Sequence, residues 1–232
     1  MLEIRNMTRD LNHPKYSPLA LDLELPPWID IVAFSLTDWE DAHERPRRLM
    51  TRCAKSHRVF FFQEPEYDAC GDPFLELAIK DRVNIMIPHL RRPDSASEKN
   101  KEKMIGLLLS LAEIHDYIFW YFSPLAVENT RAFSPRCKVY DCMNELPNLR
   151  NTIPDLYEIS RQKLSSFADL IFTTDLSMCL DPCFAKRNVH LFTDSKHPKV
   201  ADWDALWRQM SRLIHRTFKG VHPYCKRIDP QT

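Results

Sequence analysis

The stretch KVYDCMNEL, residues 138–146, begins like a buried β-strand and then turns abruptly polar, with two acids and an amide at Asp141, Asn144 and Glu145. Two explanations fit this pattern. Asp and Asn cap helices and Glu suits a first turn, so the polar part can mark the start of a helix. Alternatively, it forms a ligand site, because open α/β sheets bind ligands at the carboxyl ends of their strands.

Short apolar runs recur on both sides of this stretch and alternate with segments of helical periodicity. The runs are rich in β-branched and aromatic residues, which indicates strands buried on both faces. The seven predicted strands span residues 29–35, 58–64, 83–88, 117–123, 137–143, 169–175 and 188–194. Helices are predicted over residues 46–56, 104–115, 153–167 and 202–218, with a charged loop over 91–103 and a short helix after residue 175.

This alternation predicts right-handed βαβ crossovers and a mostly parallel sheet with helices on both faces. We therefore expect an α/β protein with a single doubly wound, Rossmann-like domain, a seven-stranded sheet and a C-terminal helix packed back on it. The domain is expected to span residues 29–220, between a polar, proline-rich arm over residues 1–28 and a tail over residues 221–232.

Polar side chains follow several of the predicted strands. Because the carboxyl ends of parallel strands meet at one edge of a sheet, these side chains are expected to lie at the edge where such folds bind ligands. The candidates are Asp38 and Trp39 after the first strand, Glu64 after the second, Ser123 after the fourth, Asp141, Asn144 and Glu145 after the fifth, Asp175 after the sixth, and Arg45 at the start of the first helix.

The composition argues against several classes of function. The 32 basic and 32 acidic side chains cancel, so the protein has no overall charge to attract nucleic acid. The chain has only three glycines and no GxGxxG or GxxxxGK loop, which argues against a dinucleotide cofactor or a P-loop, and we expect no cofactor. No run reaches the roughly 18 apolar residues of a membrane span.

The cysteines and histidines do not suggest a metal site. Cys179 and Cys183 form one pair in CLDPC, but no second pair with ligand spacing follows. The histidines likewise show no metal-ligating spacing, and we expect no metal. The odd count of seven cysteines, and a first ten residues without the apolar region of a signal peptide, favour reduced thiols and a cytoplasmic location.

Five segments, taken in order, resemble the bacterial GT-B glycosyltransferases. They are FSLTDWEDAHERPRRLMTRCAKSHRVFFFQEP at 34–65, YIFWYFSPLA at 117–126, KVYDCMNEL at 138–146, SSFADLIFTTDLSM at 165–178 and RNVHLFTDSKHP at 187–198. YDCMNEL is the most specific of these matches. Two positions depart from the family's usual pattern: Asn144 stands where the family has Asp, and Glu44 where it has Gln.

The resemblance implies a specific domain organisation. Such enzymes have an acceptor-side domain and a second, donor-binding domain for the nucleotide-sugar. Here DWDALWRQM, residues 202–210, follows the last predicted strand after about eight residues and resembles the family's C-terminal helix, which crosses back onto the first domain. The resemblance therefore implies an acceptor-side half that lacks the donor domain.

Three functions follow from this reading. The first is half of a glycosyltransferase of polysaccharide or glycoconjugate synthesis, completed by a donor-domain partner chain or by a second copy in a homodimer. Its acceptor would be a glycan or a lipid-linked sugar, with peripheral membrane contact at the inner face of the membrane. The second is a non-catalytic binding or regulatory protein derived from such an enzyme. The third is a standalone enzyme acting on another small substrate.

Each candidate residue has a functional and a structural reading. Asp141 and Glu145 would serve as the catalytic base or bind acceptor hydroxyls, or would cap a helix. Trp39 beside Asp38 offers a flat ring to a sugar or lipid tail, or is pinned under a loop. Arg45 would bind a phosphate or form an internal salt bridge. Glu64 would bind a sugar or cap a loop. Under the functional reading, Asp141→Ala should leave the fold intact and abolish ligand binding.

Overall fold

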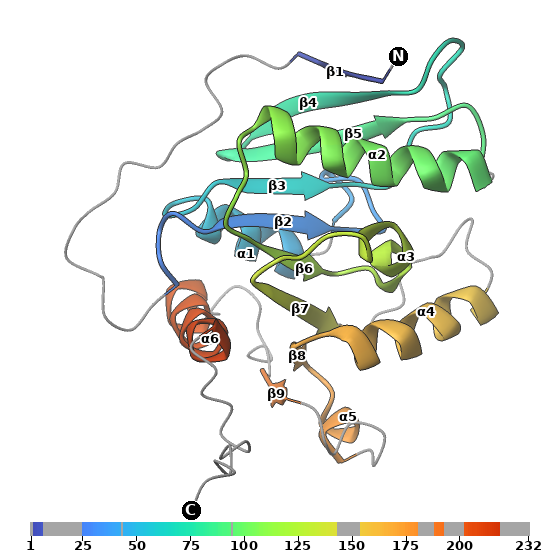
Figure 1. The fold of residues 1–232 in the computed structure, drawn as a ribbon. Helices are drawn as coiled ribbons and strands as arrows, with labels where there is room; N and C mark the ends of the chain where they lie inside the picture. The colour runs from blue at the N-terminus through green and yellow to red at the C-terminus, as the bar shows by residue number, and fades with distance from the viewer. Residues whose placement is uncertain are drawn as a thin grey trace, which may run out of the picture.

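The computed structural model describes residues 2–6, 25–42, 44–93, 95–142, 154–180, 188–192 and 202–218. Asn144, Glu145 and the tail over residues 221–232 therefore lie outside the described residues. Within them, nine strands form one sheet in the order β1-β4-β5-β3-β2-β6-β7-β8-β9 (Figure 1). The strands are β1 (Glu3–Arg5), β2 (Asp30–Phe34), β3 (Val59–Phe62), β4 (Phe74–Lys80), β5 (Val83–His89), β6 (Tyr117–Tyr121), β7 (Cys137–Cys142), β8 (Leu170–Thr173) and β9 (Val189–Leu191).

Seven of these strands are the predicted ones, and they pair in parallel in the order β5-β3-β2-β6-β7-β8-β9. The chain first builds outward from β2 through β3 to β5, then returns to the other side of β2 and builds outward again from β6. The order of the strands therefore reverses between β2 and β6, which is the arrangement of a Rossmann-like sheet.

The expected count of seven strands is wrong, because β1 and β4 extend the sheet beyond β5. β4 runs antiparallel to β5, and β1 pairs in parallel with β4. A two-residue loop joins β4 to β5, with positive φ at both Asp81 (51°) and Arg82 (68°), as a type I′ turn requires. Such turns usually contain Asn-Gly or Asp-Gly, so Asp-Arg gave no hairpin signal in the sequence.

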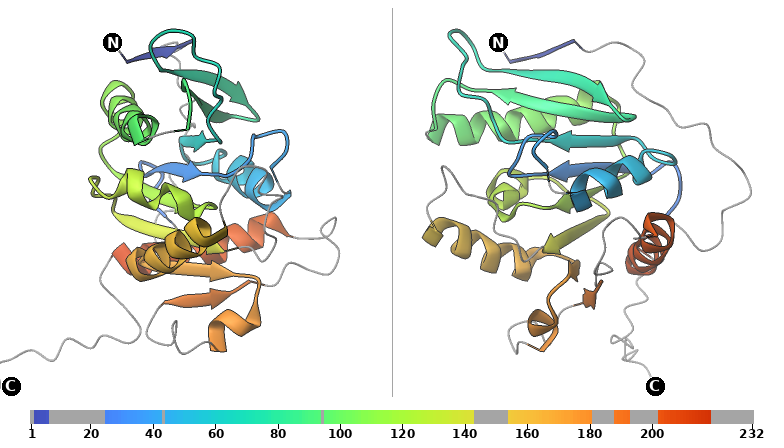
Figure 2. Two further views of the ribbon diagram at one scale, coloured as in Figure 1. Left: turned by 90° about the vertical axis from the view of Figure 1, so that its right-hand side faces the viewer. Right: turned by 180° about the vertical axis from the view of Figure 1, so that it is seen from behind.

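Helices cover both faces of the sheet (Figure 2). One core lies beneath α1 (Glu44–Cys53) and α6 (Trp203–Phe218), and the other beneath α2 (Ser95–Leu111), α3 (Val127–Thr130) and α4 (Pro154–Phe167). A 3₁₀ turn, η2 (Pro124–Ala126), precedes α3, and the short α5 (Leu176–Leu180) follows β8. The predicted loop over residues 91–103 is largely the first half of α2, whose charged residues hid its helical pattern.

The final helix, α6, packs on the same face as α1. Trp207, Met210 and Ile214 are buried there, at the 3.6-residue spacing of an amphipathic helix. The ring of Trp207 lies 6.3 Å from that of Trp120 in β6 and 5.5 Å from the imidazole of His57, measured between centroids. In the described part of the chain, none of the helices combines the length and apolarity needed to cross a membrane.

Candidate functional site

A pocket of about 760 Å³ opens at the carboxyl ends of β2, β3, β5 and β6. Phe34 and Phe62, the last residues of β2 and β3, form part of its lining. After β2 the chain leaves toward α1 on one face of the sheet, whereas after β6 it leaves toward η2 and α3 on the other. This divergence leaves space where the strand order reverses between β2 and β6, which is where open α/β sheets bind ligands. The volume of the pocket is in the range of small-molecule sites.

Glu64 supplies a partly buried carboxylate to this pocket. Burial raises the pKa of Glu64, and the nearby carboxylate of Asp38 raises it further, whereas the Lys101 ammonium opposes the shift. The pKa of Asp38 is also raised, by burial and by Asp41. Glu64, a pocket carboxylate with a raised pKa, is a candidate for proton transfer or for binding hydroxyl groups.

A second group of polar side chains lines the pocket from α2 and α3. Glu98 accepts hydrogen bonds through both oxygens, from Lys101 Nζ at 2.7 Å and from Asn129 Nδ2 at 2.9 Å. All three residues line the pocket. Sequence reasoning missed them because Glu98 and Lys101 fall in the segment that was predicted as a loop. An amphipathic reading of residues 95–111 would have placed them one turn apart on α2.

Ser123 lies at the pocket, as predicted, and also has a structural role. Its Oγ accepts a hydrogen bond from the Leu125 N–H at 3.2 Å and so caps η2. Ser35, after β2, lines the pocket as well, and its Oγ accepts from the Thr37 N–H at 3.1 Å. Both hydroxyls keep capacity to bond a ligand, since a hydroxyl oxygen has two lone pairs and one proton.

Asp141 and Arg45 form a buried ion pair rather than part of the pocket lining. Asp141 belongs to β7 itself, is fully buried, and faces Arg45, which is 4% exposed. Arg45 Nη2 lies 3.0 Å from Asp141 Oδ1, and Arg45 Nε donates to the same oxygen at 3.2 Å. This geometry favours the internal salt bridge for Arg45. It also gives Asp141 a structural partner that neither sequence reading included.

Trp39 and Asp175 also have structural partners. Trp39 is 2% exposed, and its ring lies 5.0 Å from that of Phe61 in an edge-to-face contact. The backbone N–H of Trp39 donates to Gln63 Oε1 at 3.3 Å. Burial therefore favours the packing alternative for this ring. Asp175 caps α5, accepting from the Ser177 N–H at 2.8 Å and from Ser177 Oγ at 2.6 Å.

The structure therefore brings Glu64 and Ser123 to the pocket, with Asp38 close enough to Glu64 to affect its pKa. It places Asp141, Arg45, Trp39 and Asp175 in structural contacts. Whether any of these residues binds a substrate stays a prediction. The binding roles of Asn144 and Glu145 also stay predictions.

No protein-family model matches the sequence, and no curated protein matches it. Two solved structures are similar in fold. A chain of sucrose-phosphate synthase from Thermosynechococcus elongatus superposes with a TM-score of 0.52 at 12% identity, over 82% of this chain and 99% of that chain. A trehalose-6-phosphate synthase from E. coli bound with UDP-2-fluoro glucose gives a TM-score of 0.46 at 12% identity, over 73% of this chain and 50% of that chain. The first likeness supports a Rossmann-like GT-B fold for this chain, and at this identity it establishes the fold alone.

Proposed function

We propose that this chain is the acceptor-side half of a glycosyltransferase of polysaccharide or glycoconjugate synthesis. The observation that carries the proposal is the pocket at the strand reversal, whose lining contains the partly buried Glu64 and the Glu98–Lys101–Asn129 group. Carboxylates, an amide and an ammonium around an apolar floor suit a polyhydroxylated ligand, whose hydroxyls both donate and accept hydrogen bonds.

Within the described residues, which do not include Glu145, Glu64 is the best placed base for glycosyl transfer. In this reaction an acceptor hydroxyl attacks the anomeric carbon of the donor sugar, a carbon–oxygen bond forms, and the bond to the departing diphosphate breaks. The hydroxyl proton passes to a carboxylate, and a raised pKa brings that carboxylate nearer to neutral pH, where general bases work well. Asp141, predicted from the sequence as the base, is buried against Arg45 instead.

The donor is expected to be held by a second lobe, from a partner chain or a second copy of this one. Transfer requires that both substrates be held together, and the pocket described above accounts for one of them. Exposed leucine and isoleucine side chains lie on α4 and α5, the helices that follow β7 and β8. They are Leu156, Ile159, Leu176 and Leu180. Exposed apolar groups gathered near a binding edge favour a protein contact there.

The purified chain is expected to bind oligosaccharides at this pocket without transferring sugar to them. Glu64→Gln should weaken glycan binding about 10–100-fold, because a hydrogen bond to a charged group contributes roughly 1.5–3 kcal/mol. Titration calorimetry against a panel of neutral and acidic oligosaccharides measures the effect. Glu102→Gln, an exposed position on α2 that does not line the pocket, is the matched control.

Donor binding tests the half-enzyme assignment separately. UDP-, GDP- and dTDP-sugars should show no micromolar affinity for the isolated chain and no turnover. Micromolar binding of any of them would show that this chain holds its own donor site. Glycan binding that survives Glu64→Gln unchanged would exclude this pocket as the acceptor site. Sugar binding with no transfer, even after a donor-binding partner is added, would identify a non-catalytic binding protein.

A further inference from the structure

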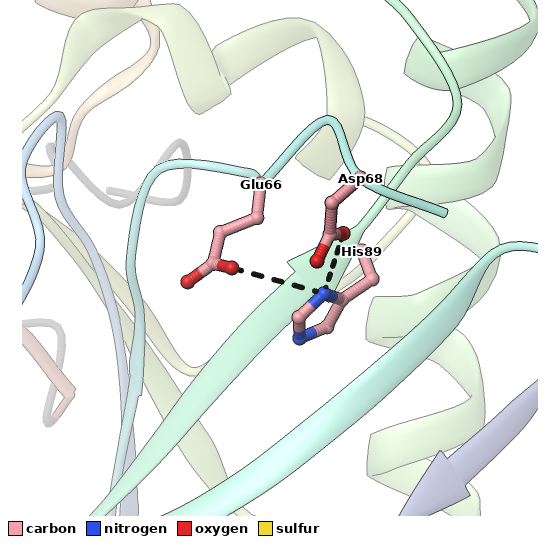
Figure 3. Close-up of side chains that lie close together, drawn as sticks. All are labelled: Glu66, Asp68 and His89. Atoms are coloured by element: carbon pink, nitrogen blue, oxygen red, sulfur yellow. Dashed lines mark hydrogen bonds and ion pairs between the residues drawn. The ribbon is translucent and has the colours of Figure 1, made fainter. Parts of the chain in front are cut away.

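A second cluster of polar side chains lies next to the pocket, between the segment that joins β3 to β4 and the end of β5. Glu66, Asp68 and His89 converge there, with one ligating atom from each within 4.8 Å of the others (Figure 3). The geometry points to a site for a divalent transition-metal ion of the Zn²⁺ type, held by these three side chains with water completing the shell. Neither the glycan pocket nor the fold comparison assigns any role to these residues.

The backbone holds the two carboxylates in place beside the histidine. Glu66 forms a β-bridge opposite His89. The Glu66 N–H donates to the Pro88 carbonyl at 2.9 Å, and the Glu66 carbonyl accepts from the Leu90 N–H at 2.8 Å. The Ala69 N–H donates to the Leu90 carbonyl at 3.1 Å, which fixes the segment beyond Asp68. The donor groups are therefore preorganised by main-chain hydrogen bonds, so little conformational entropy is lost on binding.

The ring of His89 is held in its orientation by Glu76 and Phe74. Nε2 lies 3.2 Å from Glu76 Oε2, and Glu76 Oε1 accepts from Asn6 Nδ2 at 3.3 Å. The Phe74 ring stacks on the imidazole with centroids 4.3 Å apart, and the residue is only 6% exposed. A carboxylate on the second ring nitrogen is the usual support of a metal-bound histidine, because it fixes the tautomer and directs the other lone pair at the ion.

The two carboxylates lie at unequal distances from the imidazole. Nδ1 is 2.8 Å from Asp68 Oδ1 and 3.9 Å from Glu66 Oε2, and the second distance is beyond hydrogen-bond reach. A hydrogen bond at Nδ1 therefore engages Asp68 alone, whereas a metal ion bound to Nδ1 would engage both carboxylates.

The donor set and distances fit Zn²⁺ better than the alkaline-earth ions. Ligand atoms about 2.0–2.2 Å from a tetrahedral ion lie about 3.4 Å apart, between the 2.8 Å and 3.9 Å separations of the two carboxylates from Nδ1. Imidazole nitrogen favours Zn²⁺ and its neighbours, whereas Mg²⁺ and Ca²⁺ prefer oxygen ligands throughout. Both carboxylates are exposed, so water can reach the remaining position.

The site lies beside the pocket rather than in it. Tyr67 lies between the two carboxylates in sequence, and it lines the pocket together with Pro65 and Pro88. None of the three ligating residues belongs to the pocket lining, so metal binding and glycan binding can be tested separately.

Metal binding by the full, reduced chain tests the site directly. After chelator treatment, Zn²⁺ should bind with one more equivalent in the wild type than in the double variant Glu66→Gln/Asp68→Asn, as measured by competition with a chromophoric chelator. A hundredfold excess of Zn²⁺ over its Kd should raise the wild-type Tm by roughly 5–10 °C. Glu76→Gln should weaken binding about 10–100-fold while keeping the stoichiometry.

Controls separate this site from the thiols and from misfolding. Co²⁺ bound here should show weak d–d absorption without a thiolate charge-transfer band, since no cysteine belongs to the cluster. Glu102→Gln/Asp155→Asn, two exposed acids on α2 and α4, should bind Zn²⁺ as the wild type does. Both altered residues are exposed and their replacements keep hydrogen-bonding groups, so the metal-free variant should still unfold in a single cooperative thermal transition. Equal Zn²⁺ stoichiometry in wild type and Glu66→Gln/Asp68→Asn, or no binding by either, would overturn the assignment.

Discussion

Replacing Asp141 with alanine is expected to lower the free energy of unfolding by about 3–5 kcal/mol, a larger effect than any surface substitution should give. The substitution removes the carboxylate that faces Arg45 at 3.0 Å and leaves a guanidinium buried in the interior. The loss of favourable attraction is the smaller part of the cost. The larger part is the desolvation of a charge that this carboxylate no longer balances.

Urea denaturation of the variant and the wild type measures this effect, with Glu102→Ala as an exposed control. The double variant Arg45→Met/Asp141→Leu should recover most of the loss, because replacing both members of a buried ion pair with apolar residues is often neutral or stabilising. If Asp141→Ala unfolds at the same urea concentration as the wild type, the pair contributes no stability. The expectation from the sequence, an intact fold with altered binding, would then stand.

Acid is expected to destabilise the protein through His57. Burial lowers the pKa of His57 from 6.5 to about 4, although its hydrogen bond to the Ile29 carbonyl opposes the shift. The unfolded chain therefore binds a proton below pH 6.5 that the folded chain does not bind until about pH 4. Stability is fully retained above pH 6.5 and falls through this window, by about 3 kcal/mol at the lower end.

The comparison of His57→Asn with the wild type isolates this contribution. Asparagine keeps a donor for the Ile29 carbonyl but does not titrate, so the stability of the variant should depend less on pH between 6.5 and 4. His190, whose pKa is lowered in the same direction by burial and by Arg216, adds to the wild-type slope and remains in the variant. His115→Asn, at an exposed position, should keep the wild-type slope. A slope unchanged in His57→Asn would mean that the buried imidazole is not the source.

The parallel part of the sheet could be predicted because each of its strands has a signal in its own local sequence. IVAF, VFFF and YIFWY are continuous apolar runs of strand length, which are typical of strands covered on both faces. β4 could not be predicted in the same way. FLELAIK alternates between half-buried and buried positions over its first five residues and is exposed at the last two. Its place beside β5 depends on a turn that contains no glycine or asparagine.

Site residues could be predicted from the sequence only where they directly follow a strand. Glu64 and Ser123 lie at the pocket because they follow strands whose carboxyl ends meet there. Asp141 was misread because its partner is 96 residues away, and nothing local distinguishes a paired buried acid from a cap. The same holds for His89, which meets Glu66 through a single β-bridge between segments that the sequence does not show to be neighbours.

The N-terminal strand has a consequence for handling the protein. β1 covers the outer edge of β4, with Arg5 stacked 3.6 Å from the Phe74 ring centroid. Trimming residues 1–6 would expose the outer edge of β4 over Phe74, Leu75 and Glu76, the residues that β1 pairs with. Unpaired edges recruit strands from neighbouring molecules and seed aggregation. A shortened form would therefore be prone to self-association during purification, even though the site itself lies on other strands.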